Sequence, residues 1–129
     1  MRTVRIEALT MADMARKEIL PAVAAYTGAL AEGVKGKQKV DPSLACGYET
    51  RVLRRLSALT DCADAKVEAL EKAVTTLDGI GDVTAEANFV RDEVLPRMAE
   101  LRAVCDEAET LTASSYWPFP NYGELLFGV

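Results

Sequence analysis

An apolar stripe in the middle of the chain is the feature that most constrains its fold. The stripe consists of Val52, Leu56, Leu59, Ala63, Val67, Leu70, Val74 and Leu77. Side chains spaced by three and four positions lie on one face of an α-helix, and this spacing is close to the seam of a coiled coil. A long helix buries such a face by packing against other long helices. The stripe therefore predicts a bundle.

Two further stripes of the same kind flank the first one. They consist of Ala8, Met11, Ala12, Ala15, Ile19, Val23, Tyr26 and Leu30, and of Val83, Ala87, Val90, Val94, Met98, Leu101, Cys105 and Ala108. We therefore expect an all-α fold, an elongated up-down-up three-helix bundle that forms a single domain over residues 1–129. The expected helices cover about residues 5–33, 42–78 and 82–112, and a tail covers residues 113–129.

Local signals set the expected helix ends. Gly33 and Gly36 are typical stop signals for the first helix. Asp41 and Pro42 are expected to open the second helix, as N-cap and first-turn proline. Asp82, after a glycine-containing turn, is expected to cap the third helix.

Two prolines lie inside the predicted helices, Pro21 in EILPAV and Pro96 in EVLPRM. Each removes a backbone hydrogen bond and should bend its helix. Because the first and third helices of an up-down-up bundle run parallel, we expect both kinks at similar heights, so that the bundle bends as a unit. Two alternatives are that the first helix is split at Pro21 and that the two prolines are unrelated.

Composition excludes several classes of function. The chain has no histidine, which excludes serine–histidine and cysteine–histidine catalysis within it. Its three cysteines, Cys46, Cys62 and Cys105, lack CxxC spacing and are expected to be small apolar residues of a reduced protein. The net charge of −5 argues against nucleic acid as a partner. No stretch resembles a membrane span or a signal peptide, so we expect no membrane contact and a cytoplasmic location.

Charge is unevenly distributed along the chain. Residues 1–40 carry a basic surplus and residues 82–111 an acidic one, which suggests that the two regions are complementary within the molecule. Arg51, Arg54 and Arg55 cluster on the second helix. They could line a dicarboxylate pocket in a small helical enzyme of the chorismate mutase type, but pairing with acids on neighbouring helices is the favoured interpretation. We predict no catalytic, cofactor-binding or metal-ligating residue in this chain.

The C-terminal segment YWPFPNYGELLFGV concentrates aromatic residues and carries one charged side chain, Glu124. Its prolines favour an extended conformation, and its aromatic rings favour burial. The segment is therefore predicted to fold back on its own bundle or to dock on another domain or subunit. The candidate interaction residues are Tyr116, Trp117, Phe119, Tyr122, Leu125, Leu126 and Phe127.

Two segments, IEALTMADMARKEILPAV (6–23) and YWPFPNYGELLF (116–127), together resemble the C-terminal domain of the type III glutamine synthetases. The resemblance implies a parent enzyme of glutamine biosynthesis and nitrogen metabolism, which ligates ammonia to glutamate with ATP and Mg or Mn in a large ring-built oligomer. It also implies that the catalytic ligands lie in an upstream domain. None of those motifs can be placed here, so we expect an excised module, with Met1 an added start, that is inactive alone.

The expected function is therefore non-catalytic, in assembly or domain positioning. The expected partners are the remainder of the parent polypeptide and the neighbouring subunits of a homo-oligomer. The alternative is a free-standing helical-bundle module for protein–protein interaction.

Overall fold

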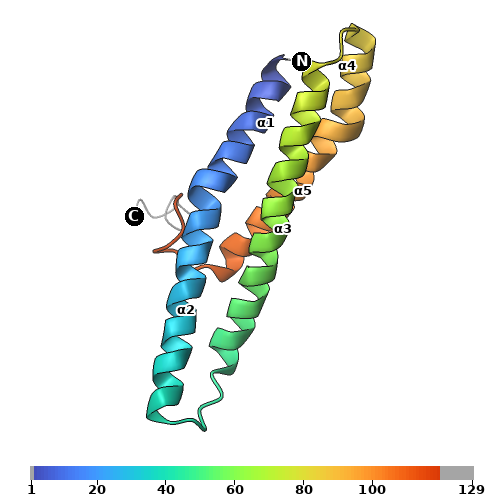
Figure 1. Ribbon diagram of the computed structural model, residues 1–129. Helices are drawn as coiled ribbons and strands as arrows, with labels where there is room; N and C mark the ends of the chain where they lie inside the picture. The colour runs from blue at the N-terminus through green and yellow to red at the C-terminus, as the bar shows by residue number, and fades with distance from the viewer. Residues whose placement is uncertain (1, 120–129) are drawn as a thin grey trace.

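The computed structural model describes residues 2–119, which form three helical rods joined by short turns (Figure 1). In the first rod, α1 (Arg2–Met14) continues through a π-helical turn, η1 (Ala15–Ile19), into α2 (Leu20–Val40). The second rod is α3 (Gly47–Asp78). In the third rod, α4 (Val83–Phe89) continues through a second π-helical turn, η2 (Val90–Val94), into α5 (Leu95–Leu111). The predicted all-α class is confirmed, and no strand occurs within residues 2–119.

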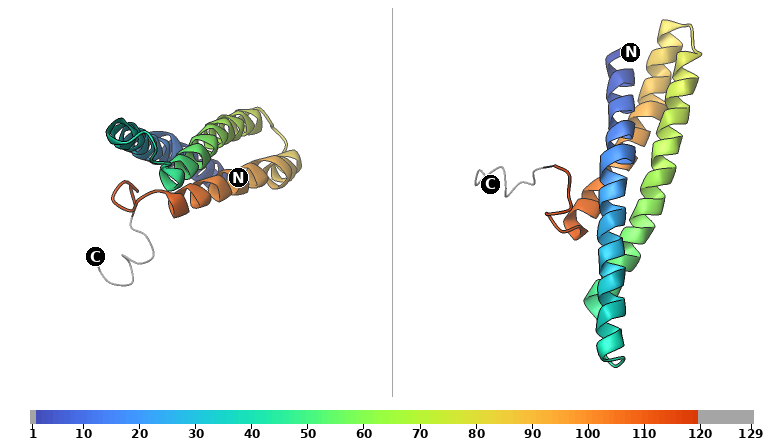
Figure 2. Two further views of the ribbon diagram at one scale, coloured as in Figure 1. Left: turned by 90° about the horizontal axis from the view of Figure 1, so that it is seen from below. Right: turned by 60° about the vertical axis from the view of Figure 1, so that its left-hand side comes forward.

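The rods alternate in direction, and α3 packs against both of the others (Figures 1 and 2). It contacts α1, α2, α5 and both π-helical turns. The third rod ends beside α2, part-way along the length of α2 (Figure 1). The last turns of α2 and the first turns of α3 therefore extend beyond the third rod as a two-helix hairpin. The molecule is thus an elongated up-down-up bundle, as predicted.

The predicted stripe of α3 forms the centre of the core. Every residue of that stripe is buried, and Leu56 and Leu70 are 0% exposed. Leu70 belongs to a cluster shared with α1 and the third rod, whereas Leu56 belongs to a second cluster shared with α2 and the end of α5. One residue of the third stripe was predicted wrongly. Val83 is 79% exposed because it is the first residue of α4, at the end of its rod.

The predicted end of the first helix at residue 33 is wrong, because the rod continues through both glycines to Val40. An isolated glycine in an exposed helix costs only about 1 kcal/mol, which neighbouring contacts can offset. Two side-chain contacts hold this last stretch. Lys37 Nζ lies 2.6 Å from Glu49 Oε2, and Gln38 Nε2 donates to the Leu44 carbonyl at 3.0 Å.

The prediction that Asp41 and Pro42 open the second helix is also wrong. The N–H of Asp41 donates to the Lys37 carbonyl at 3.0 Å, so this residue closes the first rod. Its carboxylate accepts hydrogen bonds from both the N–H and the hydroxyl of Ser43, which stabilises the turn. α3 begins at Gly47, directly after Cys46 in the left-handed region at φ 49°.

The predicted cap of the third helix is confirmed. Asp82 Oδ2 accepts a hydrogen bond from the N–H of Ala85 at 2.9 Å, which satisfies one of the unpaired donors in the first turn of α4.

A π-helical turn lies directly before each interior proline. The N–H of Leu20 donates to the Ala15 carbonyl, and the N–H of Leu95 donates to the Val90 carbonyl, five residues back in each case. These wider turns keep the backbone helical up to Pro21 and Pro96. The first rod is therefore continuous, and the alternative of a split at Pro21 is wrong. The predicted joint bending of the bundle stays a prediction.

The position of α3 predicts which leucines stabilise the fold. Leu70→Ala opens a cavity in the centre and should lower the free energy of unfolding by about 2–5 kcal/mol. Leu95→Ala, at a side chain that is 44% exposed, is the matched control and should cost far less. Urea unfolding followed by circular dichroism measures both, and equal losses would contradict this core.

Candidate interaction surface

Residues 113–117 turn back onto the bundle. The N–H of Tyr116 donates to the Ala113 carbonyl at 2.9 Å, and the N–H of Trp117 donates to the Ser114 carbonyl at 3.2 Å. The Tyr116 ring lies 5.1 Å from the Tyr26 ring of α2, centroid to centroid. Trp117 is half-buried against the core cluster around Leu56. An extended conformation is therefore wrong for residues 113–117, because these rings gain more by packing on α2 and α5 than by remaining in solvent.

Of the other predicted interaction residues, the structure describes one. Phe119 is half-buried and lies with Trp117 at a groove between the first and third rods. Tyr122, Leu125, Leu126 and Phe127 lie outside the described residues.

This groove has a volume of about 550 Å³. Its apolar lining consists of Ile6, Met11, Met14, Ala15, Ile19, Met98, Leu101, Cys105, Trp117 and Phe119. Leu101 and Ala15 are buried in its walls, whereas Ile6 is 54% and Met14 39% exposed to solvent. The groove therefore presents apolar side chains that the described part of the chain does not cover.

Charged side chains also line this groove. They are Glu7 from α1 and Arg102, Asp106 and Glu109 from α5, so acids outnumber bases by three to one. None of the four forms an ion pair with another residue whose side chain the structure describes. The groove thus combines an apolar interior with a net negative lining.

The groove was missed from the sequence because Ile6 and Met14 lie outside the predicted stripe of the first helix. They are separated by eight positions, so they occupy one face of α1 beside that stripe. This second apolar face is the signal that could have indicated an additional contact surface.

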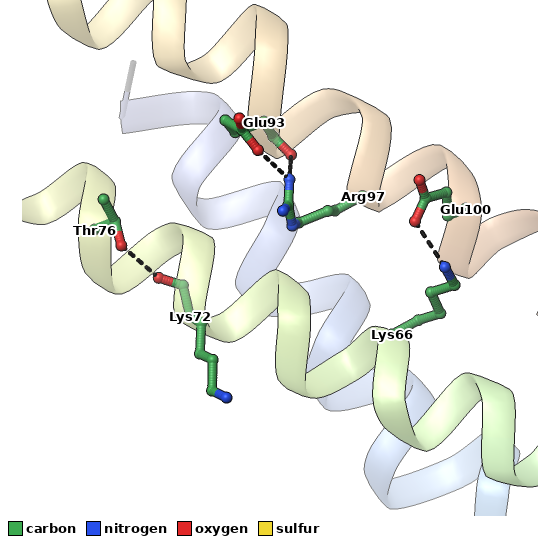
Figure 3. Close-up of polar contacts among 6 residues, drawn as sticks. All are labelled: Lys66, Lys72, Thr76, Glu93, Arg97 and Glu100. Carbon is green, nitrogen blue, oxygen red and sulfur yellow. Dashed lines mark hydrogen bonds and ion pairs between the residues drawn. The ribbon is translucent and has the colours of Figure 1, made fainter.

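Ion pairs connect α3 to each of the other rods. From the first rod, Arg5 Nε lies 2.8 Å from Asp78 Oδ1, and Arg16 pairs with Glu71. Two more pairs join α3 to α5. Lys66 Nζ lies 2.9 Å from Glu100 Oε2 (Figure 3), and Arg55 Nε lies 2.5 Å from Glu107 Oε2.

Among the described residues, no ion pair joins the basic first third directly to the acidic third helix, so the predicted complementarity does not take the form of direct ion pairs. The described ion pairs between rods all run to or from α3, which lies between the two regions. Hydrogen bonds from Arg5 and Lys66 lower the pKa of Asp78 and Glu100 respectively. Because these carboxyl groups have a lower pKa in the folded than in the unfolded protein, they stabilise the fold at a pH above their unfolded-state pKa. This stabilisation is lost as the pH falls through their folded-state pKa.

The arginine cluster lies at the start of α3, around a shallow concavity. Pairing with a neighbouring helix is confirmed for Arg55, whose guanidinium binds Glu107 through two nitrogens. The Arg51 guanidinium instead lies over the Tyr48 ring, 5.7 Å from its centroid. Arg54 lines the same concavity and has no ion-pair partner among the described residues.

The cysteines occupy three different environments. Cys105 is buried, as expected of a small apolar residue, and burial raises the pKa of its thiol to about 11. Cys62 is exposed and Cys46 is half-buried, and all three cysteines are free thiols. Within residues 2–119, no group of three metal-ligating side chains is close enough to hold an ion, and none of the helices combines the length and the hydropathy that a membrane span requires.

Comparison with known proteins gives consistent matches. Residues 1–38 match the model of a family described as "Glutamine synthetase C-terminal domain". A glutamine synthetase of Butyrivibrio fibrisolvens is 30% identical over 128 residues, which cover 99% of this chain and 18% of that protein. A type-3 glutamine synthetase of Dictyostelium discoideum is 26% identical over 130 residues, which cover 98% of this chain and 18% of that protein. The predicted resemblance to the glutamine synthetase C-terminal domain is confirmed.

The chain spans 18% of the length of these glutamine synthetases. No solved structure is significantly similar to it. Most of the length of each relative therefore has no counterpart in this chain.

The position of Trp117 predicts that it contributes to stability. Trp117→Ala removes a half-buried ring from the cluster around Leu56 and should lower the free energy of unfolding by about 1–3 kcal/mol. Tyr48→Ala, at a ring that is 58% exposed, is the control and should cost less than about 1 kcal/mol. Chemical unfolding followed by circular dichroism compares them, and a Trp117→Ala variant as stable as the parent would show that the ring does not pack there.

Proposed function

We propose that this chain is a non-catalytic C-terminal module of a glutamine synthetase and that it acts in assembly or domain positioning. The parent enzyme would ligate ammonia to glutamate at the expense of ATP, with Mg or Mn bound outside this module. Its partners would be the remainder of the parent polypeptide and neighbouring subunits of a cytoplasmic homo-oligomer.

The groove between the first and third rods is the observation that supports this proposal most strongly. Ile6 and Met14 expose apolar surface beside half-buried Trp117 and Phe119. A contiguous apolar surface with a polar border is typical of a site where another protein segment binds. An assembly role would use this surface without any reaction in the module itself.

The length of the rods also suits a positioning role. At about 1.5 Å per residue, the 32 residues of α3 extend over about 48 Å. Ion pairs and apolar contacts attach both other rods to this helix. A rigid helical unit of this length could hold two parts of a large enzyme at a fixed separation.

Removal of the module from the parent enzyme tests the proposal. The truncated enzyme should still bind ATP but should form smaller or less stable assemblies, because it lacks one contact surface. Mass photometry measures the size of the assemblies, and calorimetry measures ATP binding. Unchanged assembly size and thermal stability would contradict the proposed role.

A second variant covers the case in which truncation prevents folding. Leu70→Asp places a charge in the core and should unfold this module within the complete polypeptide. It should reproduce the loss of assembly, whereas Glu68→Asp, at an exposed position of α3, should assemble normally.

A further inference from the structure

The seam between the first and third rods is open along much of α1. Both α1 and α5 pack on α3, but the backbones of α1 and α5 approach each other closely at few positions. In a closed three-helix bundle each helix packs against both of the others. Here the groove occupies the position where the two outer rods would meet.

We propose that this groove binds a fourth helix, an amphipathic helix with basic flanks supplied by the parent polypeptide outside residues 1–129. This inference rests on the proposed function, because it assumes that the chain works as part of a larger enzyme. It identifies the surface that the module uses and the chemistry of the segment that it binds.

The dimensions of the groove fit such a helix. Its lining on the first rod extends from Ile6 to Ile19, which corresponds to about 20 Å at 1.5 Å per residue. A helix of three to four turns has that length and carries apolar side chains at steps of three and four. Those side chains would fill the volume of about 550 Å³ and cover Ile6 and Met14.

The charges identify the flanks of the incoming helix. Glu7 lies on one side of the groove, and Asp106 and Glu109 lie on the other, with Arg102 as the opposing charge. Lysine or arginine residues beside the apolar stripe of the incoming helix would face these carboxylates. Complementary charge of this kind fixes the orientation of a partner and excludes acidic competitors.

The same charges argue against two other occupants. The chain's own segment from residue 120 to 129 carries Glu124 as its one charged side chain, and a negative charge does not complement an acidic lining. A second copy of the chain has a net charge of −5, so two copies repel each other overall. A basic helix from the remainder of the parent polypeptide carries the opposite charge to the groove, so neither argument applies to it.

Photo-crosslinking in the complete parent enzyme tests the proposal. The crosslinking amino acid p-benzoylphenylalanine replaces Met14, which is exposed enough for substitution to leave the core intact. Illumination should produce crosslinks, mapped by mass spectrometry, to a helix outside residues 1–129 with lysine or arginine beside an apolar stripe. The same amino acid at Glu68, an exposed residue of α3 outside the groove, should not crosslink to that helix.

A charge reversal tests the electrostatic part. Glu7→Arg with Asp106→Arg changes two exposed residues of the groove and should lower the crosslink yield from Met14 at least about tenfold. The matched Glu7→Asp with Asp106→Glu variant keeps both charges and should keep the yield.

Several results would overturn the proposal. They are crosslinks from Met14 to residues 120–129, crosslinks to a second copy of the module, an absence of crosslinks, and a yield that does not respond to charge reversal. If one of these is found while removal of the module still reduces assembly, the proposed function stands and the module acts through another surface. If removal changes nothing, the proposed function itself fails.

Discussion

Burial of the apolar stripe of α3 is the interaction on which the rest of the structure depends. The stripe supplies both core clusters, with Leu70 in one and Leu56 in the other. The ion pairs between rods also involve α3, as in the Arg5–Asp78 and Lys66–Glu100 pairs. Because those pairs are largely exposed, they contribute little to stability and mainly favour one alignment of the rods. Apolar burial on α3 is therefore the main stabilising term.

The open groove follows from this arrangement. Because α1 and α5 are held in place by α3, they do not need to close against each other, and the surface between them keeps exposed apolar groups such as Met14. An exposed apolar surface of this kind favours either aggregation or contact with another protein segment, and the proposed function uses it in the second way. The π-helical turns before Pro21 and Pro96 preserve this geometry, because they let each outer rod continue past its proline.

The sequence was most informative where one local signal decides the structure. The stripe of α3 and the Asp82 cap were predicted correctly, since periodicity and capping act over a few neighbouring residues. The end of the first rod was not, because contacts of its last turns with the following turn and with α3 keep them helical past Gly33 and Gly36, and no local signal reveals those contacts. The groove was not predicted. Ile6 and Met14 can indicate an additional contact surface on the first rod, but the opposite wall comes from a rod distant in sequence, and neither wall alone indicates that the seam stays open.

Native-state hydrogen exchange tests the central position of α3 most directly. If both outer rods depend on α3, its buried amides, such as those of Leu56 and Leu70, exchange only by global unfolding. They should then be the slowest in residues 2–119, and their exchange free energy should equal that of complete unfolding measured with denaturant. Faster exchange in α3 than in α1 or α5 would show that the outer rods are stable without it and would contradict this account.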